Sequence, residues 1–130
     1  MSKKYALIVE DNPVTRELLT TVLGRMGGYA MLEAGDAEQA YRLLERYTPD
    51  MVILDYHLPG ANGTDVLTYI RADPRLQAAA VVLLTADNLV GHEYATVMQT
   101  ADLQLQKPVM PRDLLRMVQQ LQAVKDAALS

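Results

Sequence analysis

Short apolar runs alternate along the chain with longer segments in which apolar residues recur every three or four positions. Most of the runs are apolar throughout, which is typical of strands that are buried on both faces of a parallel sheet. The predicted strands span residues 6–9, 29–33, 51–54, 80–84 and 103–106.

The segments between these runs are predicted to be helices. Val14, Leu18, Val22 and Met26 follow one another at helical spacing, and the glycine pair at 27–28 suits a helix end. Asp36 suits an N-cap, with Gln39 three residues later completing a capping box. The predicted helices span residues 13–26, 36–47, 64–72, 89–100 and 111–125, and residues 58–63 are predicted to form a loop.

Five strands that each precede a helix predict an α/β fold, (βα)₅, with a doubly wound parallel sheet. We expect the flavodoxin-like strand order 2-1-3-4-5, which is one of the two common orders for such sheets. We predict a single domain over residues 1–130, with a core from about residue 4 to residue 124. Residues 125–130 are expected to be a tail or the start of a linker.

Composition narrows the range of functions. Half of the 130 residues are hydrophobic and the net charge is −4, while Lys and Arg are scattered, so we expect no direct nucleic-acid binding by this domain. The longest apolar runs are far shorter than the roughly 20 residues that span a bilayer, so no membrane segment is expected. The absence of cysteine excludes disulfides and thiolate metal sites, and a cytoplasmic location is expected.

Polar residues stand directly after four of the predicted strands. Glu10 and Asp11 follow the first strand, Asp55 the third, Thr85 the fourth and Lys107 the fifth. In an open parallel sheet, ligands bind beyond the carboxyl ends of the strands, at the point where the strand order reverses. The first and third strands are neighbours at that point, so three carboxylates are expected to converge there.

Three adjacent carboxylates repel one another unless a cation compensates their charge. Mg²⁺ suits the site because it prefers oxygen ligands. Lys107 would add positive charge and Thr85 a hydroxyl group, which together suit the charge neutralisation that phosphoryl transfer requires. An aspartate can serve as the nucleophile and become an acyl phosphate.

With these residues, the sequence resembles the receiver domains of two-component response regulators over nearly its whole length. The matching motifs are IVEDN at 8–12, DYHLPGANG at 55–63, LTA at 84–86 and KP at 107–108. Each motif is short, but together, in order and at strand ends, they are specific. The resemblance implies a signalling domain that catalyses only its own phosphorylation and dephosphorylation, and not an enzyme that turns over a metabolite.

The resemblance also implies roles for individual residues. Asp55 would be the phosphoacceptor, and Mg²⁺ would be held by Glu10, Asp11, Asp55 and the backbone carbonyl of His57. Thr85 would move toward the phosphoryl group, and Lys107 would pair with one of the phosphoryl oxygens. The peptide bond from Lys107 to Pro108 is expected to be cis. The implied donor is a phosphohistidine on a histidine kinase or a phosphotransfer protein. An unidentified downstream effector, and a possible homodimer, complete the expected partners.

Two positions depart from the family, and one of them is Val109, where Phe is frequent. Receivers commonly carry Tyr or Phe three residues before the lysine, where this chain has Gln104, so the coupling of Thr85 to output is expected to differ. A glutamine is costly to bury unless it is hydrogen-bonded. The side chain of His57, two residues after the phosphoacceptor, either tunes phosphoryl hydrolysis or is simply an exposed loop residue.

The same residues allow other interpretations. Glu10 and Asp11 could merely cap the first helix, and Lys107 could be a solvated loop residue. A haloacid-dehalogenase-like hydrolase would need an acid where His57 stands. A flavin or nucleotide carrier would need a Gly-rich or Ser/Thr-rich loop where Glu10 and Asp11 stand. A receiver that has lost its chemistry would be expected to lack at least one of the site residues.

Overall fold

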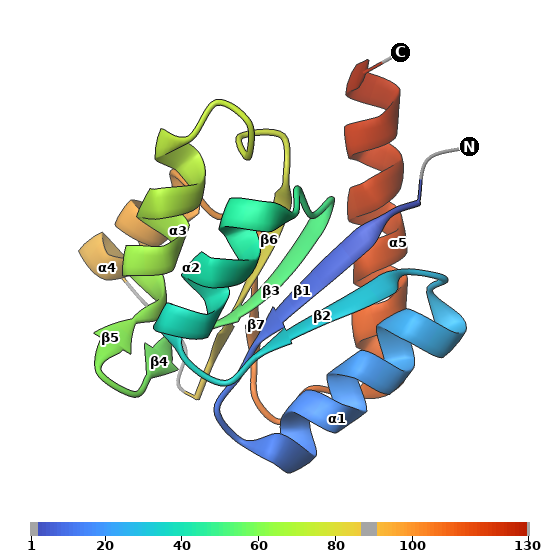
Figure 1. The fold of residues 1–130 in the computed structure, drawn as a ribbon, viewed down its shortest axis with the longest axis horizontal. Helices are drawn as coiled ribbons and strands as arrows, with labels where there is room; N and C mark the ends of the chain where they lie inside the picture. The colour runs from blue at the N-terminus through green and yellow to red at the C-terminus, as the bar shows by residue number, and fades with distance from the viewer. Residues whose placement is uncertain (1–2, 87–90, 130) are drawn as a thin grey trace.

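Five parallel strands form the centre of the fold (Figure 1). The computed structural model describes residues 3–86 and 91–129. In the described residues the sheet has the order β2-β1-β3-β6-β7, which confirms the predicted order 2-1-3-4-5. The strands are β1 (Tyr5–Val9), β2 (Ala30–Ala34), β3 (Met51–Asp55), β6 (Ala80–Thr85) and β7 (Leu103–Gln106).

Helices cover both faces of the sheet, with α1 and α5 on one side and α2, α3 and α4 on the other (Figure 1). The helices are α1 (Pro13–Thr21), the π-helix η1 (Val22–Met26), α2 (Ala37–Arg46), α3 (Gly63–Ala72), α4 (Gly91–Met98) and α5 (Pro111–Leu129). The first residues of the helix predicted at 89–100 lie outside the described residues.

Each central strand contributes to two separate hydrophobic cores because successive side chains point to opposite faces. In β1, Ala6 and Ile8 pack under α1 and α5, whereas Leu7 and Val9 pack under α2 and α3. All four are fully buried. The uniformly apolar runs in the sequence therefore reflect burial on both faces, and they fix the strand ends where the polar residues begin.

The first predicted helix changes its hydrogen-bonding pattern near its end. The N–H of Gly27 donates to the carbonyl of Val22 at 3.0 Å, a bond to the fifth preceding residue that defines a π-helical turn. Gly28 then adopts a left-handed conformation with φ of 79°, as expected for a glycine that ends a helix. The predicted end is confirmed, but the single predicted α-helix is replaced by an α-helix and a π-helical turn.

The segment predicted as a loop contains a small antiparallel hairpin formed by β4 (His57–Leu58) and β5 (Ala61–Asn62). Pro59 and Gly60 occupy its turn, and Gly60 has a φ of 73°. Proline followed by a glycine with positive φ suits a type II turn. The turn residues were thus interpreted correctly, but the strands on either side were too short to be recognised.

The last helix extends beyond the predicted end at residue 125. It continues to Leu129, and Asp126 near its end accepts hydrogen bonds from Lys4 at 2.9 Å and from Gln122 at 3.0 Å. Most of the expected tail is therefore helical and is linked to the start of β1. No helix among residues 3–86 and 91–129 is both long and apolar enough to cross a membrane.

Candidate functional site

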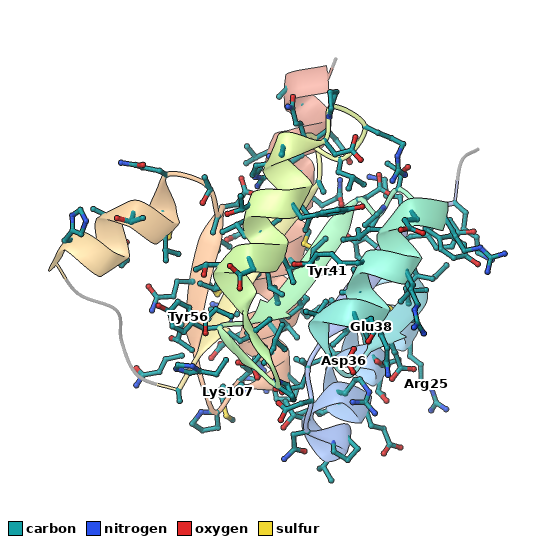
Figure 2. All side chains as sticks on the ribbon, turned by 60° about the vertical axis from the view of Figure 1, so that its left-hand side comes forward. Arg25, Asp36, Glu38, Tyr41, Tyr56 and Lys107 are labelled. Atoms are coloured by element: carbon teal, nitrogen blue, oxygen red, sulfur yellow. The ribbon has the colours of Figure 1, made fainter. Side chains whose placement is uncertain are left out.

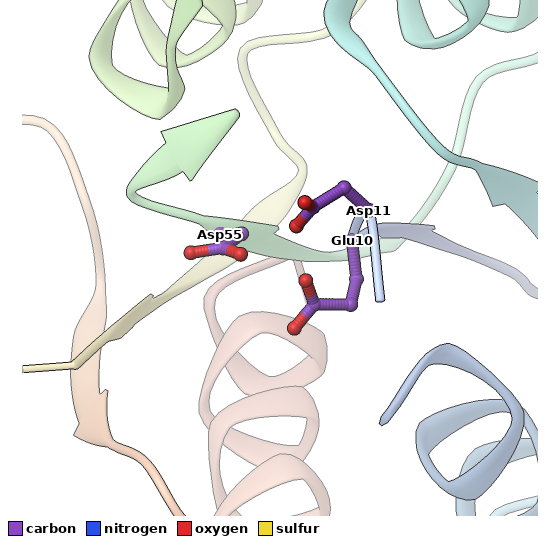
Figure 3. A group of neighbouring side chains, drawn as sticks. All are labelled: Glu10, Asp11 and Asp55. Carbon is purple, nitrogen blue, oxygen red and sulfur yellow. The ribbon is translucent and has the colours of Figure 1, made fainter. Parts of the chain in front are cut away.

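Three carboxyl groups meet where β1 and β3 end (Figure 3). Glu10, Asp11 and Asp55 each offer one oxygen, and these oxygens lie within 4.8 Å of one another. Glu10 is fully buried and Asp55 is 4% exposed, whereas Asp11 faces solvent. The predicted convergence of the three acids is confirmed, because the register of β1 with β3 brings Val9 opposite Leu54, directly before the acids.

Lys107 reaches two of these carboxylates from the loop after β7. Its Nζ lies 2.6 Å from Oε1 of Glu10 and donates a hydrogen bond of 2.9 Å to Oδ2 of Asp55. The peptide bond from Lys107 to Pro108 is cis, as the sequence resemblance implied. Figure 2 shows Lys107 at the same end of the molecule as Tyr56, the residue after Asp55. Lys107 is therefore part of the site and not a solvated loop residue.

The charged groups in this cluster shift the pKa values of Glu10 and Lys107. Burial, together with the hydrogen bond and negative charge of Asp55, raises the pKa of Glu10 to about 7 despite the opposing effect of Lys107. Burial alone would lower the pKa of Lys107, but its hydrogen bonds to Glu10 and Asp55 outweigh this effect and raise the pKa. One ammonium group thus compensates two carboxylates only in part, and the site retains an excess of negative charge.

The backbone after β3 fixes the orientation of the Asp55 side chain. The N–H of His57 donates to Oδ1 of Asp55 at 3.2 Å, and the N–H of Tyr56 donates to the carbonyl of Leu84 at 2.8 Å. Gly63, which begins α3, lies so close that a Cβ built on it would be 2.2 Å from the carbonyl oxygen of Asp55. A residue larger than glycine would therefore displace the chain beside Asp55.

Asn12, and not Glu10 or Asp11, caps the first helix. Its side-chain oxygen accepts hydrogen bonds from the N–H groups of Val14 at 2.9 Å and Thr15 at 3.1 Å. The interpretation of Glu10 and Asp11 as simple helix caps is therefore wrong. Their carboxylates belong to the acidic cluster instead. The carboxylate of Glu10 also accepts a hydrogen bond of 3.3 Å from the N–H of Asn12.

Thr85 ends β6 and is 1% exposed. Its hydroxyl oxygen accepts a hydrogen bond of 3.1 Å from Nε2 of Gln104, a partly buried residue of β7. The polar side chain at the position where the family commonly carries an aromatic ring therefore has a hydrogen-bonding partner, which offsets its cost of burial. The side chain of His57 is exposed and packs edge-on against the ring of Tyr56, with the ring centres 4.8 Å apart.

The site contains three contributions that the sequence analysis missed. These are the cap at Asn12, the close approach of Gly63 to Asp55, and the contact between Gln104 and Thr85. A pattern of Asn followed by Pro at a helix start was the available signal for the cap. The other two depend on how the β3–α3 connection folds back and on the register of β6 with β7, which no local pattern specifies.

The donor set fits a hard divalent cation. Its side chains offer carboxylate oxygens, and Oε1 of Glu10 is buried with no hydrogen-bond partner among the described residues beyond its ion pair with Lys107. The cluster also retains uncompensated negative charge, which a divalent cation would neutralise. The same edge of the sheet presents the hydroxyl of Thr85 and the ammonium of Lys107, both suited to an anionic oxygen-rich group.

Comparison with known proteins agrees with this arrangement. Residues 6–119 match the family model of the response regulator receiver domain. The DNA-binding response regulator MtrA of Mycolicibacterium smegmatis is 36% identical over 116 residues, which cover 89% of this chain and 49% of that protein. The phosphate regulon transcriptional regulatory protein PhoB of Pseudomonas aeruginosa is 32% identical over 115 residues, which cover 88% of this chain and 50% of PhoB. The chain thus spans about half the length of these relatives.

A solved receiver domain that holds magnesium shares the fold of this chain. The receiver domain of sensor histidine kinase PA1611 from Pseudomonas aeruginosa, determined with a magnesium ion coordinated in its active-site cleft, has a TM-score of 0.81 and 30% identity, with 94% of this chain and 99% of that chain covered. A CheY-like receiver domain protein from Methanospirillum hungatei has a TM-score of 0.86 at 23% identity, covering 98% and 99% of the two chains, and supports the fold alone.

The chain belongs to the response regulator receiver domain family. Its members are signalling domains of two-component systems and not conventional enzymes. The acidic pocket of Glu10, Asp11 and Asp55 is consistent with magnesium-dependent phosphorylation of an aspartate.

Proposed function

We propose that this domain accepts a phosphoryl group on Asp55 in a two-component phosphorelay, with Mg²⁺ bound at the acidic cluster. The observation that carries the proposal is the position of Asp55. It is buried, within 4.8 Å of two further carboxylates, and hydrogen-bonded to Lys107 at 2.9 Å. A capping or structural aspartate would have no need of two adjacent acids, because their repulsion destabilises the fold.

Each residue of the site has a role in this proposal. Glu10, Asp11, Asp55 and the backbone carbonyl of His57 would hold Mg²⁺, which when bound neutralises charge on the carboxylates and on the phosphoryl oxygens. The ammonium of Lys107 would pair with a phosphoryl oxygen, for which it is already at the right edge of the sheet. The buried hydroxyl of Thr85 would donate to another phosphoryl oxygen once the group is attached.

The donor would be a phosphohistidine on a histidine kinase or a histidine phosphotransfer protein. A carboxylate oxygen of Asp55 forms the new bond to phosphorus, and the bond between phosphorus and the imidazole nitrogen breaks. The electron pair of the broken bond stays on that nitrogen. Phosphorylation would then change the binding of a downstream effector, and the reaction would take place in the cytoplasm, where phosphohistidine is formed from ATP.

The test is intact-mass measurement after incubation with Mg²⁺ and acetyl phosphate. We expect the gain of one phosphoryl group, and its loss when Mg²⁺ is chelated or when Asp55→Ala is used. Asp113→Asn, which removes an exposed carboxylate from the first turn of α5, is the matched control and should gain the group normally. Tight binding of beryllofluoride would give the same answer if the adduct is short-lived. The absence of both a mass gain and beryllofluoride binding would refute the proposal.

A further inference from the structure

The hydrogen bond between Gln104 and Thr85 constrains the direction of the Thr85 hydroxyl group. A hydroxyl has one hydrogen and two lone pairs, whereas the amide nitrogen of glutamine can only donate. Nε2 of Gln104 therefore occupies a lone pair of Oγ1 of Thr85, at 3.1 Å. Among the described residues, Oγ1 of Thr85 donates no hydrogen bond, so its hydrogen is not committed to the protein.

The sheet register explains how the two side chains meet. Leu83 pairs with Gln104 and Thr85 with Gln106, so the side chains of these four residues project from the same face of the sheet. Gln104 therefore lies two register pairs before Thr85, and its side chain extends along the strand direction to the Thr85 hydroxyl. Thr85 is 1% exposed, so water cannot readily replace this partner.

We propose that Gln104 is a positioning residue for phosphoryl transfer: its amide binds the Thr85 oxygen and leaves the Thr85 hydrogen free for a phosphoryl oxygen on Asp55. This inference rests on the proposed function, because it requires a phosphoryl group at Asp55. It assigns to a polar side chain of β7 an influence on the reaction that is exerted through the Thr85 hydroxyl. No movement of an aromatic ring is needed for this contact.

The decisive variant is Gln104→Glu. A carboxylate of similar shape can accept but cannot donate, so it would take the Thr85 hydrogen and turn it away from Asp55. The lost contact is a hydrogen bond to a charged group, so we expect phosphorylation by acetyl phosphate to slow about tenfold. Gln104→Leu, which neither donates nor accepts, is expected to slow the reaction less, by roughly threefold, because the hydroxyl is then free to rotate.

Gln106→Glu is the matched control for added negative charge. Gln106 lies two residues along the same strand and on the same face, but it is exposed, and its Nε2 donates to the carbonyl of Ala86 at 3.4 Å. We expect its phosphorylation rate to stay within about twofold of the wild type, since exposed charges are strongly screened. Thermal unfolding of each variant would confirm that it is folded.

A double mutant separates positioning from a structural or purely electrostatic effect. In a Thr85→Ala background, Gln104→Glu should cause no further slowing, because the hydroxyl through which it acts is gone. An equal slowing in both backgrounds, or a rate for Gln104→Glu that matches Gln106→Glu, would overturn the inference while leaving phosphorylation of Asp55 intact. A wild-type protein that gains no phosphoryl group would overturn the proposed function and this inference together.

Discussion

Nζ of Lys107 lies 2.6 Å from Oε1 of Glu10, although the strands that lead to these two residues, β7 and β1, are separated by β6 and β3. The lysine side chain thus spans the end of the sheet above Asp55. It supplies the positive charge that permits two acids to be buried beside each other. A single ammonium group pairs with both carboxylates, so negative charge remains. Binding of a further cation or protonation of a carboxylate would neutralise it.

Binding of Mg²⁺ should stabilise the fold. A ligand that binds only the native state adds about 2.7 kcal/mol to the free energy of unfolding at one hundred times its dissociation constant. Urea unfolding with and without Mg²⁺ should reveal this difference for the wild type. Asp11→Asn should lose most of the stabilisation by Mg²⁺, because the substitution removes one of the three carboxylates of the cluster. Asp113→Asn should keep it, and an unchanged difference in Asp11→Asn would mean that the ion binds elsewhere.

In a chelating buffer, Asp55→Asn should be more stable than the wild type. The substitution keeps the shape of the side chain and removes one of three neighbouring negative charges. Lys107 retains Glu10 as a partner, and the pKa of Glu10 should fall, because Asp55 is one cause of its elevation after burial. We expect a gain of about 1 kcal/mol in the free energy of unfolding, which is the usual scale of a single stabilising substitution. A loss of stability by urea unfolding would show instead that the Lys107–Asp55 pair outweighs the repulsion.

Stability should decline at alkaline pH through Tyr29. Burial, followed by the charges of Asp50 and Asp126, raises the pKa of Tyr29 from 10.0 to about 12. The folded state therefore holds its proton where the unfolded state loses it, so the contribution is complete below pH 10 and is lost as the pH rises through 12. The contribution of Tyr29 to the free energy of unfolding that is lost in this range is roughly 2 kcal/mol.

Tyr29→Phe should remove this part of the pH dependence, which urea unfolding across the alkaline range would measure. The hydroxyl of Tyr29 donates to Gln122 at 2.8 Å, so some stability is lost at every pH. Tyr94→Phe is the control, because Tyr94 is 44% exposed. If both variants keep the wild-type slope, Tyr29 is not the group that titrates.

Much of the fold follows from patterns that are local in the sequence. Apolar runs marked the strands, and the strand ends placed Asp55, Thr85 and Lys107 at one edge of the sheet. The hairpin after β3 was missed because its strands have two residues each, too short for any periodicity to appear. The end of α5 was misplaced because residues 126–129 carry no helix-stop signal, and the contact of Asp126 with Lys4, at the opposite end of the chain, is not visible in a local pattern.

The electrostatics of the site could be predicted only in outline. Convergence of the acids followed from the strand order, but the raised pKa of Glu10 depends on how deeply its side chain is buried and how closely Asp55 approaches it, which no local pattern specifies. The same is true of Gln104. The sequence indicated that a glutamine there needs a hydrogen-bonding partner, but only the register of β6 with β7 identifies that partner as Thr85.

Two glycines in the β3–α3 connection, Gly60 and Gly63, differ in which other residues could replace them. Gly60 has a positive φ, and a Cβ added to it would meet no atom within 4 Å, so its requirement is only for the left-handed backbone, which asparagine also tolerates. Gly63 instead has no room, because a Cβ would lie 2.2 Å from the Asp55 carbonyl oxygen. A saturation library selected for phosphorylation should therefore return glycine and asparagine at position 60 but glycine alone at position 63. Position 63 thus offers protein engineers no freedom, although its residue has no side chain and takes no part in the chemistry.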